Sequence, residues 1–270
     1  MRPLSKLYTY KCLSILLQYN HMNAAAIDKT LRQLAVDNKE YAVFNRRVIN
    51  TNKRVYGVRV PVLRHLAKQL VRYGIDNAAK TNSNTKTAPL SVADIRTFLR
   101  ELDKTVYEQV LLGGLLINYT KMNDETMIDL IRCYLPLVDS WAEIDTFVER
   151  RARFRANTWW NFACENLHQN GEFFVRYGVV MLMRNFLTPD NMNCVFTELR
   201  TISHDGYYAK IAMAWLYAEA ALVSFDQTMN ELSIAPIDVW IKKKAMQKMK
   251  ESRRFTPEQQ AIIAEERGAL

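Results

Sequence analysis

Apolar residues recur at intervals of three and four positions along almost the whole chain, which is the spacing of one face of an α-helix. The segments 106–115 and 127–135 each carry one such apolar face. Between 179 and 187, and again between 211 and 223, the chain is apolar nearly all round, as is typical of helices buried inside a bundle. Strict alternation of period two is hard to find, so the pattern predicts an all-α protein.

Several positions carry the signals that start an α-helix. Ser91–Asp94 has the pattern of a capping box, in which the serine oxygen accepts an N–H that the first turn leaves free. Thr188–Asp190 and Thr256–Glu258 each place a threonine before a proline at the first helical position, followed by an acid that suits the positive end of the helix dipole. Pro61 predicts a helix that runs to about Tyr73.

The same pattern predicts the organisation of the chain. It indicates about eleven to thirteen helices, mostly of about 10 to 18 residues, joined by short turns. The segment 79–90, rich in Asn, Thr, Lys and Ser, is predicted to be an exposed loop between helices. Successive helical hairpins of about 40 residues favour a HEAT-like stack that forms a single domain over residues 1–270. A compact bundle without repeats fits the same pattern.

Composition narrows the fold and suggests a kind of partner. Glycine is scarce, with 8 residues in 270, whereas turn-rich β architectures and glycine-loop nucleotide-binding folds both depend on it. The chain carries 37 Lys and Arg against 28 Asp and Glu, a net charge of +9. This balance is compatible with a polyanionic partner but does not require one.

The positive residues are clustered along the chain. Nineteen of the 37 lie in the segments 46–72, 150–155 and 242–254. Phosphate binding favours such clustering, because each neutralised phosphate releases counterions and adds affinity. Three solvated helix faces would give the same pattern, although a stacked array can bring all three clusters to one surface. Nucleic acid is therefore one candidate partner.

The motifs of several enzyme classes are absent. The sequence has no Gly-x-Gly-x-x-Gly, no phosphate-binding loop and no His-Glu-x-x-His, and its four histidines are scattered, which argues against a metal site or a Ser-His-Asp triad. No signal peptide or membrane-spanning stretch is evident, so we expect a cytoplasmic protein without metal or cofactor. The cysteines lie far apart and are expected to be free thiols: Cys12, Cys133, Cys164 and Cys194.

The most distinctive segment is Val138–Phe147. Trp141 and Asp145 are four residues apart, so on a helix they share one face and can set an indole beside a carboxylate. The alternative is a core tryptophan and an acid that pairs with a nearby arginine, and spacing alone favours this alternative. A second aromatic segment, Tyr207–Trp215, ends in an indole inside a nearly apolar helix, where core packing is the default.

Taken together, four segments resemble the AlkD-like DNA alkylation repair glycosylases. They are Gly57–Lys68, Trp141–Phe147, Tyr207–Glu219 and Lys244–Arg254. They occur in the family's order and span residues 40–255, which is most of the chain. Each segment is weak alone, whereas the set of four is fairly specific.

The resemblance implies a curved stack of HEAT-like hairpins whose basic concave face holds duplex DNA. It also implies hydrolysis of the N-glycosidic bond of cationic alkylated purines, such as 3-methyladenine and 7-methylguanine, without base flipping. By motif position, Asp145 matches the catalytic carboxylate, and Trp141 and Trp215 match the two indoles that wall the lesion. The matching arginine and the basic clusters give the expected DNA contacts: Arg176, Lys210, Arg46, Arg47, Arg59, Lys244, Lys248 and Arg253.

The chain departs from the family's pattern at two places. Leu216–Glu219 follows the second indole, where the family tends to be more basic, and Tyr177 stands where a basic residue is expected. Two alternatives therefore stay open: a non-catalytic DNA-binding protein of the same fold, and a protein–protein scaffold. The leading prediction is a monomeric, metal-free, monofunctional glycosylase that associates with the nucleoid through duplex DNA.

Overall fold

The computed structural model describes residues 24–35, 39–73 and 89–270. These residues form fourteen α-helices and three short 3-10 helices, and no β-strand occurs among them. The all-α prediction is confirmed. The fourteen α-helices exceed the predicted eleven to thirteen, and two of them, α8 (Trp141–Phe147) and α11 (Met192–Arg200), have only seven and nine residues.

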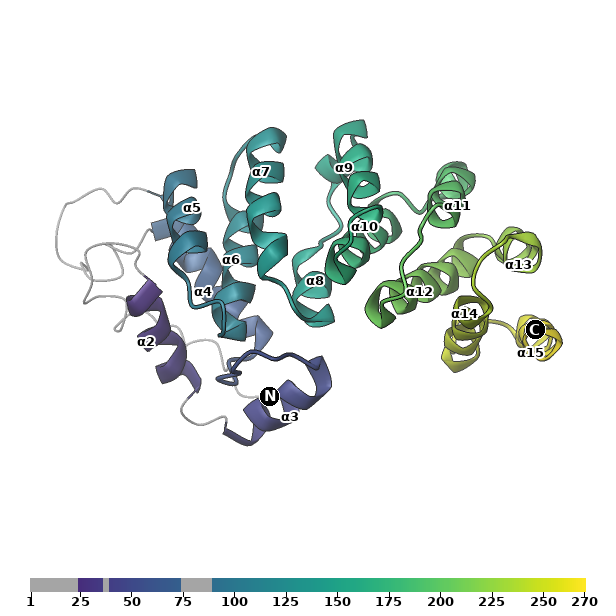
Figure 1. Ribbon diagram of the computed structural model, residues 1–270, viewed down its shortest axis with the longest axis horizontal. Helices are drawn as coiled ribbons and strands as arrows, with labels where there is room; N and C mark the ends of the chain where they lie inside the picture. Colours follow the sequence, from purple (N-terminus) through teal and green to yellow (C-terminus); the bar gives the residue numbers. More distant parts are fainter. Residues whose placement is uncertain (1–23, 36–38, 74–88) are drawn as a thin grey trace. The chain divides into compact units, whose positions relative to one another are not determined.

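The chain divides into two compact units, residues 1–147 and residues 148–270. The described helices of the first unit are α2 (Ala24–Ala35), α3 (Lys39–Ile49), α4 (Val60–Tyr73), α5 (Val92–Glu101), α6 (Tyr107–Tyr119), α7 (Asp124–Tyr134), η1 (Leu135–Leu137) and α8 (Figure 1). Those of the second unit are η2 (Ala152–Arg155), α9 (Asn157–Leu167), α10 (Glu172–Asn185), η3 (Pro189–Asn191), α11, α12 (Tyr207–Val223), α13 (Phe225–Ile234), α14 (Val239–Glu251) and α15 (Pro257–Ala269).

Alternate helices pack against one another within each unit. In the first unit α6 contacts both α4 and α8, and in the second unit α12 contacts both α10 and α14. A row of alternate helices is what stacked helical hairpins produce. The single HEAT-like superhelix over the whole chain stays a prediction.

Helix α6 is the centre of the first unit. It contacts α4, α5, α7 and α8, and twelve of its thirteen residues are buried. The spacing over 106–115 predicted one apolar face, but the helix is buried on all sides because it has neighbours all round. Its buried polar residues are consequently bound inside the protein: the Asn118 amide, for example, donates to the Phe147 carbonyl at 2.5 Å.

The second unit is built around α10 and α12. Both helices are buried nearly all round, as the apolar runs at 179–187 and 211–223 predicted. Gly178 allows α10 to approach α9 closely, because a Cβ at this position would lie 2.6 Å from the Ala163 carbonyl oxygen. The large rings of Trp159, Tyr177 and Tyr217 fill the core of this unit.

Two of the predicted caps and one helix start are confirmed. Ser91 and Asp94 form a capping box at the start of α5. Thr256 caps α15, and Gln259 completes that box by accepting the Thr256 N–H at 3.0 Å. Helix α4 includes Pro61 and ends at Tyr73, as predicted. These signals are local in sequence, which is why they can be identified without tertiary information.

The predicted cap at Thr188 is wrong. Its side chain caps no helix, and Pro189 begins the single 3-10 turn η3, closed by the Asn191 N–H donating to the Thr188 carbonyl at 3.1 Å. The α-helix begins only at Met192. Of the predicted loop at 79–90, all but the last two residues lie outside the described residues.

Candidate functional site

Helix α8 carries the indole and carboxylate that the sequence analysis singled out. Trp141 and Asp145 are both half-buried and stand one helical turn apart, so they share a face. The prediction that this segment is helical is confirmed. The intervening residues of α8 are buried and fix the helix against the core of the first unit.

The start of α8 is tied to the end of α3. The Trp141 indole N–H donates to the Val48 carbonyl at 3.3 Å, and the Ser140 hydroxyl donates to the Ile49 carbonyl at 3.1 Å. The last turn of α3 also carries Arg46 and Arg47, both exposed. Two of the predicted DNA-binding arginines therefore lie on the helix that holds the Trp141 ring.

A buried ion cluster lies next to the contact between α3 and the start of α8. The Lys53 amino group, only 5% exposed, lies 2.6 Å from the Asp139 carboxylate and 3.1 Å from that of Glu143. The Glu143 carboxylate also accepts the backbone N–H groups of Asp139 and Ser140 at 3.0 and 3.1 Å. Burial raises the pKa of Glu143 to about 7, although Lys53 acts in the opposite direction.

A second buried carboxylate organises the segment before α4. Glu108 of α6 accepts the backbone N–H groups of Tyr56, Gly57 and Val58 at 2.7–3.2 Å. Burial raises the pKa of Glu108, and these N–H groups act against that rise. Gly57 has φ of 99°, a conformation that side chains disfavour. Arg59, the residue just before α4, is exposed.

Two arginines of this region engage neighbouring side chains. The Arg59 guanidinium lies 4.2 Å from the centre of the Tyr41 ring, as a cation–π contact. Arg64 donates to the Thr146 carbonyl at 2.9 Å and to the Tyr119 hydroxyl at 2.7 Å. Because Thr146 follows Asp145, the Arg64 guanidinium is anchored at the peptide next to the candidate carboxylate.

Trp215, the second predicted indole, lies in the second unit. Its N–H donates to Glu219 at 3.2 Å, and the Arg184 guanidinium stands 5.9 Å from its ring centre. Arg254 donates to Glu219 at 2.7 and 3.1 Å and holds the pKa of that carboxyl below its usual range. Trp215, Glu219 and Arg254 border a cavity of about 220 Å³, and Lys248 lines it as well.

The other residues of the second unit that are predicted to contact DNA differ in how exposed they are. Arg176 is 4% exposed and donates to the Tyr208 carbonyl at 3.0 Å, so in this conformation its guanidinium supports the start of α12. Lys210 lies 2.5 Å from Asp238, and Lys244 donates to Gln247 at 3.0 Å. Arg253 is exposed. Their contact with DNA stays a prediction.

Comparison with known proteins finds a family whose sequence model matches part of the chain. Residues 27–157 match the sequence model of a family described as DNA alkylation repair enzyme. This part of the chain, just under half of its length, is similar to the DNA alkylation repair family. The resemblance seen in the sequence is confirmed over that region. Neither the curated proteins nor the solved structures contain a match.

The region that matches the DNA alkylation repair family contains one of the two candidate sites. It begins inside α2, continues through α8 and η2 to the first residue of α9, and includes Trp141, Asp145 and the arginines at 46, 47 and 59. Trp215 and Arg176 lie beyond it. The candidate site on α8 therefore lies inside the matched region, and its assignment stays a prediction.

The structure revises the first basic cluster, which the sequence presented as free of acids. Lys53 is buried between two carboxylates, and Arg54 lies 2.7 Å from Asp103, an acid from a distant part of the chain. The exposed cations of this segment that a phosphate could approach are Arg46, Arg47, Arg59, Lys68 and Arg72. In the third cluster Lys242 is buried and donates to the Ser233 carbonyl at 3.3 Å.

Sequence reasoning missed the buried ions that position the site. Lys53 was assigned to a surface cluster, and Glu143 was overlooked although it lies inside the segment singled out for Trp141. Glu108 offered a signal, because a carboxylate inside an apolar helical run needs several hydrogen-bond donors when it is buried. The residues next to each buried charge in the sequence do not indicate which distant residue pairs with it.

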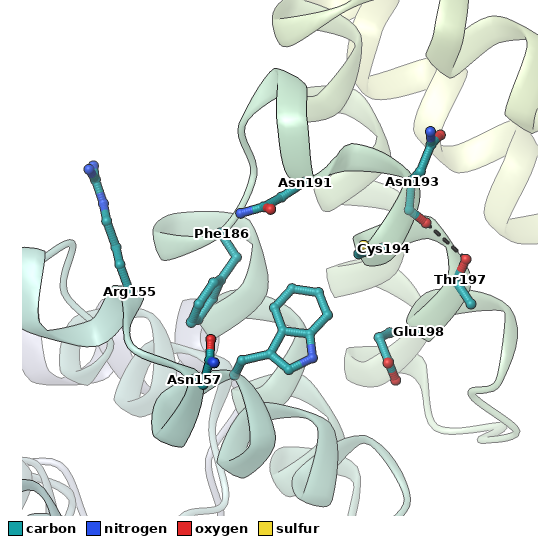
Figure 2. Close-up of a pocket in the computed structure, with 9 residues that line it drawn as sticks. Arg155, Asn157, Phe186, Asn191, Asn193, Cys194, Thr197 and Glu198 are labelled. Atoms are coloured by element: carbon teal, nitrogen blue, oxygen red, sulfur yellow. Dashed lines mark hydrogen bonds between the residues drawn. The ribbon is translucent and has the colours of Figure 1, made fainter.

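A cavity of about 490 Å³ in the second unit lies apart from the predicted site residues. Figure 2 shows side chains from the start of α9, from the end of α10 and from α11 around it, including Asn157, Phe186 and Asn193. Arg155 of the second basic cluster also lines it. The cavity is open and of mixed polarity, and no sequence-predicted site residue other than that cluster's arginine borders it.

The described residues contain neither a candidate membrane-spanning helix nor a group of side chains placed to hold a metal ion. None of their helices combines the length and the apolar character needed to cross a membrane. No group of three or more His, Cys, Asp and Glu among them is arranged to hold a metal ion. Cys133, Cys164 and Cys194 are free thiols, and Cys12 lies outside the described residues.

Proposed function

We propose that this protein is a DNA glycosylase that hydrolyses the N-glycosidic bond of cationic alkylated purines, such as 3-methyladenine and 7-methylguanine, in duplex DNA. The observation that carries the proposal is the pairing of Trp141 and Asp145 on one face of α8, inside the region that matches the DNA alkylation repair family. The two other carboxylates of this segment, Asp139 and Glu143, are committed to Lys53.

The chemistry requires little more than this pair. A purine alkylated at N3 or N7 is already cationic, so it can leave without a general acid. What the protein must supply is a negative charge that stabilises the oxocarbenium-like sugar and orients a water molecule, and the Asp145 carboxylate is assigned to that role. The Trp141 ring beside a cationic nucleotide contributes about 0.5–2 kcal/mol of cation–π stabilisation.

Trp215 is proposed as a second aromatic wall for the lesion, on the strength of the sequence resemblance. The Arg184 guanidinium lies near the Trp215 ring, and Arg254 is bound to Glu219, the hydrogen-bond partner of that ring. The surroundings of Trp215 therefore support a role beside a cationic nucleotide. We propose no base flipping and no metal in this reaction.

The test is the release of free methylpurine. The purified full chain, incubated with dimethyl-sulfate-treated duplex at physiological salt, should release 7-methylguanine or 3-methyladenine faster than the spontaneous rate. Chromatography of the released bases measures this directly. Salt-sensitive duplex binding without release would instead identify a non-catalytic DNA-binding protein, and absence of duplex binding at low salt would identify a protein scaffold.

The exposed arginines of α3 provide a separate prediction about DNA affinity. We expect an Arg46→Ala/Arg47→Ala variant to weaken duplex binding and to lower the slope of log K against log salt by about 1.8, if each arginine neutralises one phosphate. Fluorescence anisotropy over a salt series measures the slope. Arg54→Ala is the matched control, because the Arg54 guanidinium is held 2.7 Å from Asp103. Equal slopes in both variants would contradict the assignment.

A further inference from the structure

Aromatic rings gather where α12 and α14 begin, and Tyr207 is the exposed one among them. The Tyr207 ring makes edge contacts with Tyr208 at 5.1 Å and with Trp240 at 5.8 Å between ring centres. Phe173 of α10 stacks behind Tyr208 at 5.7 Å. We call Tyr207, Tyr208 and Trp240 the aromatic shelf. All of it belongs to the second unit, and the predicted lesion-binding residues do not include it.

Tyr207 is the accessible part of the aromatic shelf. The residue is 56% exposed, an unusual fraction for a large ring, yet neighbouring rings contact it from two sides. The interplanar angles of 82° and 70° show that these neighbours meet Tyr207 edge to face. A ring that is already held in place loses little conformational entropy when a ligand stacks on it.

The charges around the shelf nearly cancel. Its lysines are Lys210 and Lys244, with amino groups 5.9 and 5.8 Å from the centre of the Trp240 ring. Its acids are Asp238, 2.5 Å from Lys210, Asp205, 3.9 Å from Lys210, and Glu172, which accepts the Tyr208 backbone N–H. A ligand of this surface is therefore recognised mainly through an aromatic face.

We propose that the aromatic shelf binds an unpaired DNA base, which stacks on the exposed face of Tyr207. Every base offers a flat π-face, so this contact tolerates any sequence, and the nearby lysines can approach the adjoining phosphates without dominating the affinity. The proposal rests on the proposed function in taking DNA as the partner. It does not depend on Asp145 or on the release of a base.

Binding of short oligodeoxythymidine tests the proposal. By fluorescence anisotropy, Tyr207→Ala should weaken binding by about 5- to 100-fold, the range expected for the loss of one base stack. Tyr207→Phe should bind like the unaltered protein, because it keeps the ring. Ile234→Ala, which truncates a side chain 69% exposed on α13, is the control for removing an exposed apolar group and should have no effect.

The salt dependence separates stacking from phosphate binding. The Tyr207→Ala variant should lose the same factor in affinity at low and high salt, since no ion pair is removed. A changed slope, an unchanged affinity or no binding of oligodeoxythymidine by the unaltered protein would overturn the proposal. So would tighter binding of oligouridine, which would identify RNA, or a change of oligomeric state in Tyr207→Ala, which would identify a self-association surface.

Failure of the proposed glycosylase function gives a different result. If no methylpurine is released while oligodeoxythymidine binding still depends on the Tyr207 ring, the shelf stands and the catalytic assignment falls. If methylpurine is released while Tyr207→Ala binds oligodeoxythymidine normally, the glycosylase assignment stands and the proposal for the aromatic shelf fails. A duplex with one bulged base provides a second substrate on which the same four proteins should rank in the same order.

Discussion

Replacing Asp145 with Asn should reduce the release of 7-methylguanine from methylated duplex by about 100-fold or more, while duplex affinity changes less than about threefold. Asparagine has nearly the same shape as aspartate but no charge. It therefore keeps the packing of α8 and removes the electrostatic stabilisation of the sugar cation in the transition state. Single-turnover release and anisotropy titration measure the two quantities separately.

The matched control is Asp129→Asn. Asp129 is also an aspartate on a helix of the first unit, its side chain is 52% exposed, and Arg132 lies 3.7 Å away on the same helix. This variant removes the same charge at a position with no proposed role, so its release rate should equal that of the unaltered protein. Equal rates for Asp145→Asn and Asp129→Asn would contradict catalysis by Asp145.

The experiment also distinguishes the two interpretations of Asp145 that the sequence left open. If the carboxylate only neutralises nearby arginines, its loss should lower stability and leave any release of methylpurine unchanged. Arg64, anchored at the adjacent Thr146 carbonyl, makes such a structural role a real alternative. Urea unfolding of Asp145→Asn, measured beside its release rate, separates a destabilised protein from a folded and inactive one.

The features that sequence predicted well are local ones. The capping box at Ser91 and the start and end of α4 depend on residues within one or two turns, and both are confirmed. The burial of α10 and α12 followed from their apolar composition alone. The spacing of Trp141 and Asp145 likewise predicted a shared helix face, because four residues nearly complete one turn.

The features that sequence could not predict depend on contacts between distant segments. Lys53 meets Asp139 and Glu143 across 86 and 90 residues, so nothing near Lys53 in the chain indicates that its charge is buried. Arg54 and Asp103 are separated in the same way. The segment 46–72, free of acids in sequence, is therefore partly neutralised in the folded protein, and the charge offered to DNA is smaller than the sequence count.

The distant contacts of Lys53 lead to the second large prediction. Lys53→Met should lower the free energy of unfolding by about 3–5 kcal/mol near neutral pH, the cost of removing one partner from a buried ion cluster. The methionine fills the space of the lysine stem, so the loss arises from the carboxylates that stay behind. Urea unfolding followed by helical circular dichroism measures the change.

The effect of Lys53→Met should grow with pH. In the folded protein the pKa of Glu143 is about 7, above the ordinary value of 4.5, so its contribution to stability is full below pH 4.5 and is lost as pH rises through 7. Lys53 lowers this pKa, and its removal must raise it further. The stability of the variant should therefore keep falling between pH 7 and 8, where the unaltered protein has largely levelled off.

A second substitution tests whether Glu143 is the cause. Adding Glu143→Gln to Lys53→Met removes the buried acid and keeps an oxygen that can accept the N–H groups of Asp139 and Ser140. The double variant should be more stable than Lys53→Met at pH 8 and equal to it at pH 5, where Glu143 is already protonated for the most part. A loss in Lys53→Met that is the same at pH 5 and pH 8 would show that the Asp139 ion pair or packing around the Lys53 stem, rather than the buried charge of Glu143, accounts for the effect.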